Sequence, residues 1–347
     1  MGRSTVYNAV TSPEKLKQVN PDNIELGKDF LDYLRSIDRS PSTIYNYNSD
    51  LNIFWVWNME NNKDKNFTDI SKRELAKFQS YGLNDLGWSS NRIRRVKSCL
   101  SSLSNYIENI LDEEEEFKNF RSIIRKIENP QKETVREKTI LSTEQVEYLL
   151  DELVEAKKYQ CACAVALAAY CGCRKSEICR FKVEYFDESN LVNNAYYKTP
   201  EKIKTKGHGA KLGKQLIKYT MADFKKYFDL WMNERKERGI ESEWLFVSKE
   251  DGEWVQAKIS TMDSYAATCS RILGVPFYFH CLRHYLRTLM GARNLPTEVV
   301  VTWFGWGSED GTGGAEMASL YNDAKAEDSF GDFFTEDGIK QVQKSSL

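Results

Sequence analysis

Apolar residues recur at a spacing of three to four through the first third of the chain. The clearest stretches are residues 42–55 and 93–110, where aromatic and aliphatic side chains fall on one helical face. This spacing predicts amphipathic helices that share a core. Helix starts are predicted at polar residues that cap N-termini, two of them as capping boxes: Asp22 or Asn23, Ser42, Ser71 with Glu74, Ser89 or Ser90, and Ser142 with Gln145.

The pattern changes near residue 123, where the sequence becomes polar and charged and Pro130 interrupts any helix. We interpret residues 123–139 as a linker between two domains. Beyond it, β-branched and aromatic residues mixed with Asn, Gly and Lys predict short strands over residues 183–218. The remaining elements are a helix at 160–170, turns at Asn193-Asn194 and 207–209, a short strand at 244–247, and helices after Ser260 and around Leu282, Glu298 and Met317. The predicted fold is mainly α with a small antiparallel β-sheet, divided into an N-terminal helical domain and a C-terminal α+β domain.

Composition narrows the protein class. Apolar residues make up 41% of the chain, enough for real cores, yet no run of them is long enough to span a bilayer. The polar N-terminus has no signal-peptide core. Five of the eight cysteines lie within residues 161–179, a spacing typical of small buried side chains kept reduced in a cytosol. We therefore expect a cytoplasmic protein with no membrane partner, no metal and no cofactor.

Charge is distributed unevenly, although the net charge of −2 argues mildly against a nucleic-acid partner. Acidic residues collect at 112–116, and basic residues collect at 92–97 and 198–218. The first basic cluster falls on the opening turns of a predicted helix, where free backbone N–H groups also favour phosphate. The residues predicted to bind DNA are Arg92, Arg94, Arg95, Lys97, Lys204 and Lys211.

Four separated motifs in the second half carry residue types suited to phosphoryl transfer. Cleaving a phosphodiester without a metal requires positive charge around the phosphorus, and the arginine fork matches two phosphate oxygens. A tyrosine can attack phosphorus and later leave, provided that cations stabilise its phenolate. The motifs are GCRKSEI with Arg174 and Glu177, a lysine-rich hairpin, HCLRH with His280, Arg283 and His284, and FGW followed by LYND with Trp306 and Tyr321.

In this order, behind a helical first domain, the motifs resemble those of the tyrosine recombinase, or phage integrase, family. Gly172, Arg174, Ser176 and Glu177 match the first arginine motif, and His280 with Arg283 matches the second. Trp306 matches the position before the nucleophile, and Tyr321 matches the nucleophile, with a glycine-rich segment between them that is longer than usual in the family. The resemblance extends over about residues 22–325.

The resemblance implies a role for each residue. Arg174 and Arg283 would hold the phosphate, His280 would bond to it or move a proton, and Tyr321 would attack. Trp306 would donate an indole N–H, while Glu177 and His284 would support the cluster. A hairpin lysine would protonate the leaving 5′ oxygen. Lys206 fits this role best, and Lys204, two positions earlier on the same side of a strand, remains an alternative.

The resemblance also implies an organisation and partners. Residues 1–21 would form an N-terminal tail, 22–122 a core-binding domain, 140–325 the catalytic domain, and 326–347 a tail docking on its own domain or on a neighbouring subunit. The chain would be a site-specific recombinase, monomeric when free and a homotetramer on double-stranded DNA recombination sites. Three alternatives stay open: a type IB topoisomerase, a DNA-binding relative without catalysis, and a helical scaffold that does not bind DNA.

Overall fold

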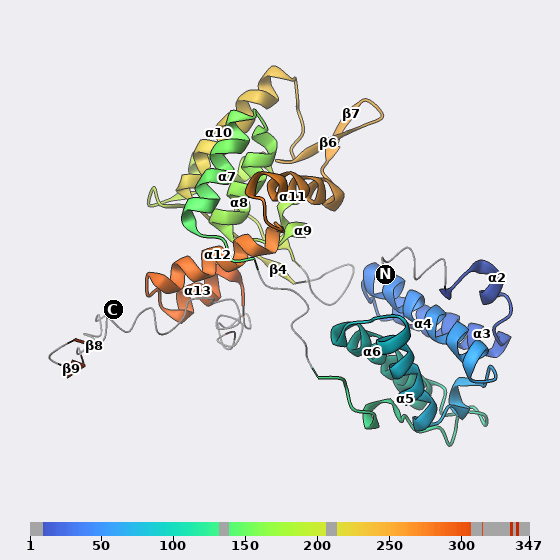
Figure 1. Cartoon of the computed structure of the whole chain (residues 1–347). Coiled ribbons are helices and arrows are strands. Elements are labelled where there is room, and N and C mark those ends of the chain that lie inside the picture. The colour runs from blue at the N-terminus through green and yellow to red at the C-terminus, as the bar shows by residue number, and fades with distance from the viewer. Residues whose placement is uncertain are drawn as a thin grey trace. The chain divides into compact units, whose positions relative to one another are not determined.

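The computed structural model describes residues 10–131, 139–205, 214–306, 314, 334–335 and 338–339. The described residues fall into two compact units, one on each side of the break that follows residue 131. Each unit has its own hydrophobic core. Figure 1 labels their elements along the chain.

The first unit is helical. Its core is rich in aromatic side chains, among them Phe30, Phe54, Trp55 and Phe78, and α4 packs against both α3 and α6. A π-helical turn, Tyr81–Asp85, follows α5 directly. The helices of this unit are α2 (Pro13–Leu16), α3 (Pro21–Ser36), α4 (Pro41–Asn61), α5 (Lys72–Ser80) and α6 (Ser90–Ile110).

Helix starts agree with the sequence in three places and differ in two. The capping boxes Ser71–Glu74 and Ser142–Gln145 are present, and Ser89 caps α6. The helices α3 and α4 begin earlier than predicted, capped by Asn20 and by Ser40 instead of Asp22 or Asn23 and Ser42. The reason is a proline at the first helical position of each, where its missing N–H costs no hydrogen bond and its fixed φ suits a helix.

The segment after α6 packs onto the first unit. Ile124, in the short 3₁₀ helix Ile124–Lys126, is 3% exposed, and Ile123 and Ile127 pack against the same core. Residues 123–131, which the charge pattern placed in a linker, are thus held at their start by three isoleucines. Residues 132–138 lie outside the described part of the chain.

The second unit is built around a buried helix. Nearly every residue of α8 (Tyr159–Cys171) is buried, including its three cysteines, so this helix is apolar on all sides. It contacts α7, α10 and α12. All eight cysteines of the chain are buried free thiols. The other helices of this unit are α7 (Thr143–Glu155), α9 (Lys175–Ile178), α10 (Lys225–Glu237), α11 (Ile259–Leu273), α12 (Phe279–Ala292) and α13 (Thr297–Phe304).

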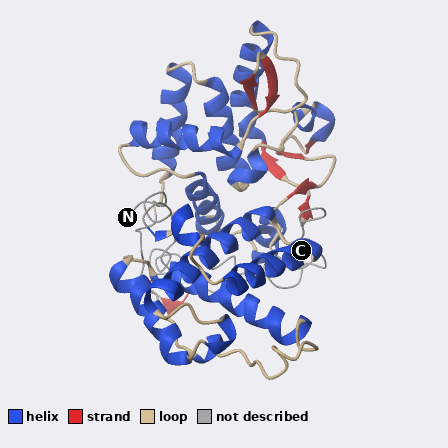
Figure 2. Cartoon of the chain, turned by 90° about the vertical axis from the view of Figure 1, so that its right-hand side faces the viewer, coloured by secondary structure: helices blue, strands red, loops and turns tan. Residues whose placement is uncertain are grey.

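Short antiparallel strands complete the second unit, as Figure 2 shows in red. The largest sheet has the order β1–β2–β5, and its first turn contains Asn193 and Asn194, both with positive φ as asparagine tolerates. The other pairs are two-stranded: β3 with β4, β6 with β7, and β8 with β9. The strands are β1 (Leu191–Val192), β2 (Tyr196–Lys198), β3 (Ile203–Lys204), β4 (Gln215–Leu216), β5 (Tyr219–Met221), β6 (Val247–Glu250), β7 (Glu253–Gln256), β8 (Phe334–Thr335) and β9 (Gly338–Ile339).

Two stretches differ from the sequence prediction. Residues 183–190, expected within the strand region, form the 3₁₀ helices Val183–Phe186 and Glu188–Asn190. The strand expected at 244–247 begins only at Val247, because Trp244 forms a single bridge to Lys182 and the chain then turns into the β6–β7 hairpin. Across the described ranges, every helix is too short or too polar to traverse a bilayer.

Candidate active site

Gly172 forms the turn on which the candidate site is built. It ends α8 in the left-handed conformation, with φ +68, and its N–H bonds to the Ala168 carbonyl. A Cβ at this position would lie 2.3 Å from Cε1 of Phe304 and 3.1 Å from Cδ2 of Leu286. Glycine is therefore required twice, by the backbone conformation and by the close approach of α13 and α12.

Arg174 follows two residues later, where it opens α9. Its backbone N–H donates to Oε2 of Glu177 at 3.0 Å, and its guanidinium donates to Oε1 of the same carboxylate at 2.9 Å. Nζ of Lys218 lies 2.6 Å from Oε2, so two cations share one carboxylate. Glu177 and Lys218 are buried, while the Arg174 side chain is 27% exposed. The arrangement keeps one face of Arg174 within reach of an anionic substrate.

The carboxylate of Glu177 is ionised in spite of its burial. Burial alone raises its pKa, but the charge and hydrogen bond of Lys218, and then the charge of Arg174, outweigh burial and lower the pKa to about 2. The cluster of one carboxylate and two cations therefore carries a net positive charge at neutral pH.

Arg283 reaches the same turn from α12. It is completely buried, with NH1 donating to the Gly172 carbonyl at 2.6 Å and NH2 donating to the Phe304 carbonyl at 3.3 Å. Its guanidinium carbon lies 4.7 Å from the ring centre of Phe304 and 5.0 Å from that of Trp306. The two carbonyls and two rings hold the guanidinium without neutralising its charge.

The remaining predicted residues of this motif set lie on neighbouring turns. His280 and His284, one turn apart on α12, meet edge to face with ring centres 5.4 Å apart. Trp306 is 5% exposed and stacks on Phe304 at 4.5 Å. The structure thus brings Arg174, Glu177, Arg283 and Trp306 around Gly172 and Phe304, with the two histidines on the helix that carries Arg283.

The lysine hairpin packs beside this cluster. Lys204 lies in β3, where its carbonyl accepts a hydrogen bond from Arg180 at 2.6 Å, and β3 pairs with β4. A Cβ on Gly305, whose φ is +65, would lie 2.2 Å from Cδ1 of Leu216 in β4. Lys214 donates to the Gly305 carbonyl at 3.2 Å. Lys206, Lys211 and Tyr321 lie outside the described residues.

The predicted DNA-binding residues at the start of α6 have partners within the first unit. Arg92 and Arg95 both bond to the fully buried carboxylate of Asp50, at 2.7 and 2.8 Å. Arg94 donates to the Pro130 carbonyl at 2.6 Å. The two Asp50 partners remain partly exposed, 22% for Arg92 and 37% for Arg95. These contacts fix the direction of the arginines and leave part of their surface to solvent.

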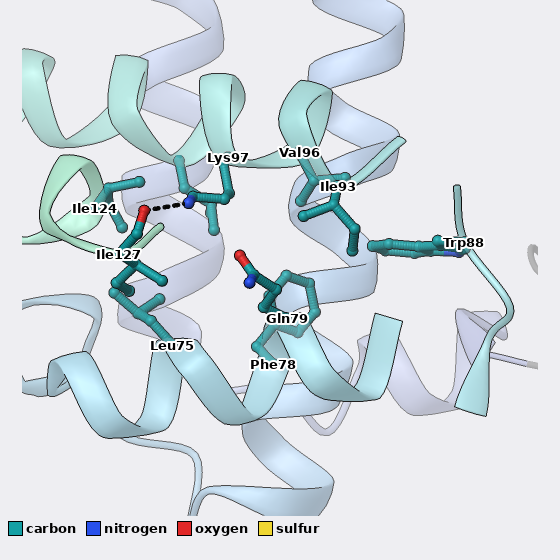
Figure 3. Close-up of a pocket in the computed structure, with 10 residues that line it drawn as sticks. Leu75, Phe78, Gln79, Trp88, Ile93, Val96, Lys97, Ile124 and Ile127 are labelled. Carbon is teal, nitrogen blue, oxygen red and sulfur yellow. Dashed lines mark hydrogen bonds between the residues drawn. The ribbon is translucent and has the colours of Figure 1, made fainter. Parts of the chain in front are cut away.

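Lys97 differs from its neighbours because its side chain enters an apolar pocket. Figure 3 shows its ammonium bonded to the Ile127 carbonyl, at 2.6 Å, among Leu75, Phe78 and Ile124. Burial lowers the pKa of Lys97. In this conformation Lys97 holds the segment after α6, and a phosphate contact would require it to leave that carbonyl.

A polar groove of about 580 Å³ runs along the exposed side of α6. Among the described residues that line it, none is acidic. Hydroxyl, amide and cationic side chains predominate: Arg94, Lys97, Ser98, Ser101, Ser102, Asn105, Arg125 and Asn129, together with Ile124 and Ile127. These groups suit an anionic, hydrogen-bonding partner such as a nucleic-acid backbone.

Sequence reasoning missed Lys218. It belongs to the lysine-rich stretch, and nothing in its neighbours separates a buried lysine from an exposed one. The only available signal was its position one residue before a short strand facing the apolar α8. In the described ranges, no group of three His, Cys, Asp or Glu side chains is placed to hold a metal ion.

Comparisons with known proteins agree with this geometry. A model of the phage integrase family matches residues 139–325. The SPbeta prophage-derived recombinase-like protein YomM of Bacillus subtilis (strain 168) is 30% identical over 258 residues, 74% of each chain.

Two solved structures share the fold at low sequence identity. XerH site-specific recombinase bound to a palindromic difH substrate has a TM-score of 0.61 and 17% identity, covering 90% of this chain and 95% of its own. A lambda integrase tetramer bound to a Holliday junction has a TM-score of 0.60 and 16% identity, covering 86% and 76%. Taken with the arginine cluster around Gly172, the match over more than half of the chain shows that this protein belongs to the phage integrase family of tyrosine recombinases.

Proposed function

We propose that this chain is a site-specific recombinase that cleaves and rejoins double-stranded DNA through a 3′-phosphotyrosine intermediate, without a metal or ATP. The observation that carries the proposal is the pair of arginines fixed at one turn, Arg174 through Glu177 and Arg283 through the Gly172 carbonyl. Two preorganised guanidinium groups are what a pentacoordinate phosphorus requires in the absence of a metal.

The proposed reaction conserves bond energy. The phenol of Tyr321 gives up its proton to a base, for which His280 is the candidate, and its oxygen bonds to phosphorus. The bond from phosphorus to the 5′ oxygen breaks, and a hairpin lysine donates a proton to that oxygen. Lys206 is the proposed donor, with Lys204 as the alternative. Rejoining runs in reverse, as a 5′ hydroxyl attacks the phosphotyrosine and Tyr321 leaves. Arg174 and His280 would bind the phosphate, and Arg283, whose guanidinium is completely buried in this structure, would bind it once uncovered. Trp306, Glu177 and His284 would support them.

The proposed partner is duplex DNA carrying a recombination site. The groove along α6 and the exposed parts of Arg92 and Arg95 support backbone contacts by the first unit, residues 22–122 in our division. Lys204, Lys211, Arg94 and Lys97 are the other proposed contacts. By analogy with the lambda integrase tetramer on a Holliday junction, we propose that the chain is monomeric when free and tetrameric on two sites. A DNA substrate would place the activity in the cytoplasm of its host cell.

The recombinase and topoisomerase proposals differ in what DNA they accept. Purified protein is incubated with two supercoiled plasmids, one carrying the DNA that flanks the gene and one without it. We expect exchange between copies of the flanking DNA and no relaxation of the control plasmid. Relaxation of both plasmids would instead favour a type IB topoisomerase. Binding without any strand breakage would favour a relative that has lost catalysis.

Arg174→Ala is the sharpest test of the phosphate site. Its side chain is partly exposed, so the variant should fold and bind DNA while cleavage falls by about 10²-fold or more. Arg283→Ala is a poorer test, because the loss of a fully buried guanidinium leaves two carbonyls without their donor and should also destabilise the fold. Cleavage by Arg174→Ala at the wild-type rate would remove this arginine from the site.

A further inference from the structure

Lys218 differs in burial from the other described lysines of the hairpin region. Only 2% of its side chain is exposed, and its ammonium lies 2.6 Å from a carboxylate that is itself completely buried. Lysine is rarely buried unless its charge is compensated. Its backbone is fixed as well, because the Lys218 N–H donates to Oγ1 of Thr199 and its carbonyl accepts from the Thr199 N–H, each at 3.0 Å.

We propose that Lys218 is a positioning residue that keeps the Arg174 cluster cationic. The inference rests on the proposed function, because it concerns the charge available to a scissile phosphate. Glu177 anchors Arg174 by two hydrogen bonds, but a lone carboxylate would cancel the charge of the arginine it holds. Lys218 supplies the second cation, so the cluster of Glu177, Arg174 and Lys218 retains a charge of one.

The two carboxylate oxygens of Glu177 have different partners. Oε1 of Glu177 accepts from the Arg174 guanidinium, whereas Oε2 accepts from the Arg174 backbone and contacts Lys218. Lys218 therefore approaches from the buried side and Arg174 from the partly exposed side. No contact of Lys218 with the substrate is required, since it acts through Glu177.

The groups near the cluster include the thiols of Cys171 and Cys173 and the hydroxyl of Thr220. Both thiols are buried at the end of α8 and the start of the turn. Glu177, Arg174 and Lys218 are joined to one another by ion pairs, and Arg283 adds a further cation on the Gly172 turn.

The test uses Lys218→Met, Glu177→Gln and the double variant in the full chain. Single-turnover cleavage of a nicked duplex that carries the site is measured with DNA affinity. Lys218→Met should lower the cleavage rate by roughly 10- to 100-fold, less than the loss of a direct donor, with unchanged affinity. Lys225→Met is the matched control, because Lys225 pairs with Asp229 on the exposed side of α10. This variant should cleave at the wild-type rate.

A purely structural lysine would not change the pH profile of cleavage. In Lys218→Met the pKa of Glu177 should rise, because burial remains while the charge of Lys218 is gone. Protonation of Glu177 in this variant restores a net charge of one on the pair of Glu177 and Arg174, so its cleavage should recover toward the wild-type rate as the pH becomes mildly acidic. The double variant lacks the buried carboxylate, so its profile should lose this pH dependence, and its defect should not exceed that of Glu177→Gln alone.

The outcomes separate the two proposals. If the wild type cleaves and Lys218→Met cleaves equally well with the same pH profile, the role of Lys218 is refuted and the recombinase proposal stands. Additive defects in the double variant would also refute it, because Lys218 would then act independently of Glu177. If Lys218→Met fails to fold, the double variant still decides, since it leaves no buried charge uncompensated. If the wild type never cleaves a verified site, the proposed function itself fails.

Discussion

At the scale of single residues, two glycines with the same φ have different surroundings. Gly172 and Gly274 both end helices at φ +68. A Cβ on Gly172 would meet Phe304 and Leu286, whereas a Cβ on Gly274 would meet no atom within 4 Å. The comparison separates the backbone requirement for glycine from the requirement for close packing at the candidate site.

Gly172→Ala should therefore destabilise the protein by more than Gly274→Ala. Both variants incur left-handed strain of about 1–2 kcal/mol, and only Gly172→Ala adds the displacement of Phe304, for which we expect a further 1–3 kcal/mol or so. Urea unfolding of the two variants measures the difference. Equal losses would mean that the contact between Gly172 and Phe304 relaxes freely.

Glu177 should make stability depend on pH in the acid range. Its pKa is lowered to about 2 from the ordinary 4.5 of a glutamate, so its contribution to stability is fully present above pH 4.5 and is lost as the pH falls toward 2. Glu177→Gln should flatten the stability curve of the second unit between about pH 5 and pH 2. The exposed Glu241→Gln is the control and should leave that curve unchanged.

Local motifs group several residues of the candidate site, whereas contacts between distant parts of the sequence cannot be obtained from them. Arg174 and Glu177 lie three residues apart and the residues around Arg283 form one helical turn, so the sequence could group each pair. Lys218 joins the cluster only because β5 packs against α8. The burial of Lys218 results from the fold, and the lysine-rich sequence around it gives no sign of that burial.

At the scale of elements, helix starts were predictable wherever capping chemistry alone determined them. The helices α3 and α4 begin earlier than predicted because each has a proline at its first position. The segment after α6 packs against the core of the first unit through three isoleucines. The β6–β7 hairpin was missed because its turn, Asp251-Gly252, lies in a charged stretch that reads as a loop.

A buried carboxylate of α4, that of Asp50, pairs with two arginines of α6. Asp50→Asn should cost about 2–3 kcal/mol of stability, because Arg92 and Arg95 lose the charged acceptor that both of them share. Asp32→Asn is the matched control, since the exposed pair of Asp32 and Arg35 should contribute less than about 1 kcal/mol. Denaturant unfolding monitored by the tryptophans of the first unit would report both, and similar losses would show that Asp50 does not join these helices.

At the scale of the whole molecule, the net charge of the chain does not indicate the charge of the surface proposed to bind DNA. The chain carries a net charge of −2, yet the described residues that line the groove along α6 include no acidic side chain. The division into a helical unit and a second unit with small sheets could be anticipated from periodicity. The pairing of Arg92 and Arg95 with Asp50 could not be, because it joins positions 42 or more residues apart.

DNA affinity should fall steeply with salt. Phosphate contacts release condensed counterions, so a plot of log affinity against log salt concentration should be linear with a slope near −0.9 per contact. Arg125→Ala, in the groove, should reduce the slope by about one contact, whereas Lys226→Ala, on the exposed side of α10, should not. An affinity that stays flat between low and moderate salt would argue against backbone binding by this surface.

The most direct measurement is the identity of the residue that becomes linked to DNA. The protein is incubated with a nicked duplex carrying its own site, denatured, and digested, and the DNA-linked peptide is mapped by mass spectrometry. We predict a 3′-phosphotyrosine at Tyr321, and complete loss of the covalent complex in Tyr321→Phe with DNA affinity retained. A link at Tyr265, Tyr278 or Tyr285 would contradict the assignment, and no link at all on a verified site would contradict the recombinase mechanism.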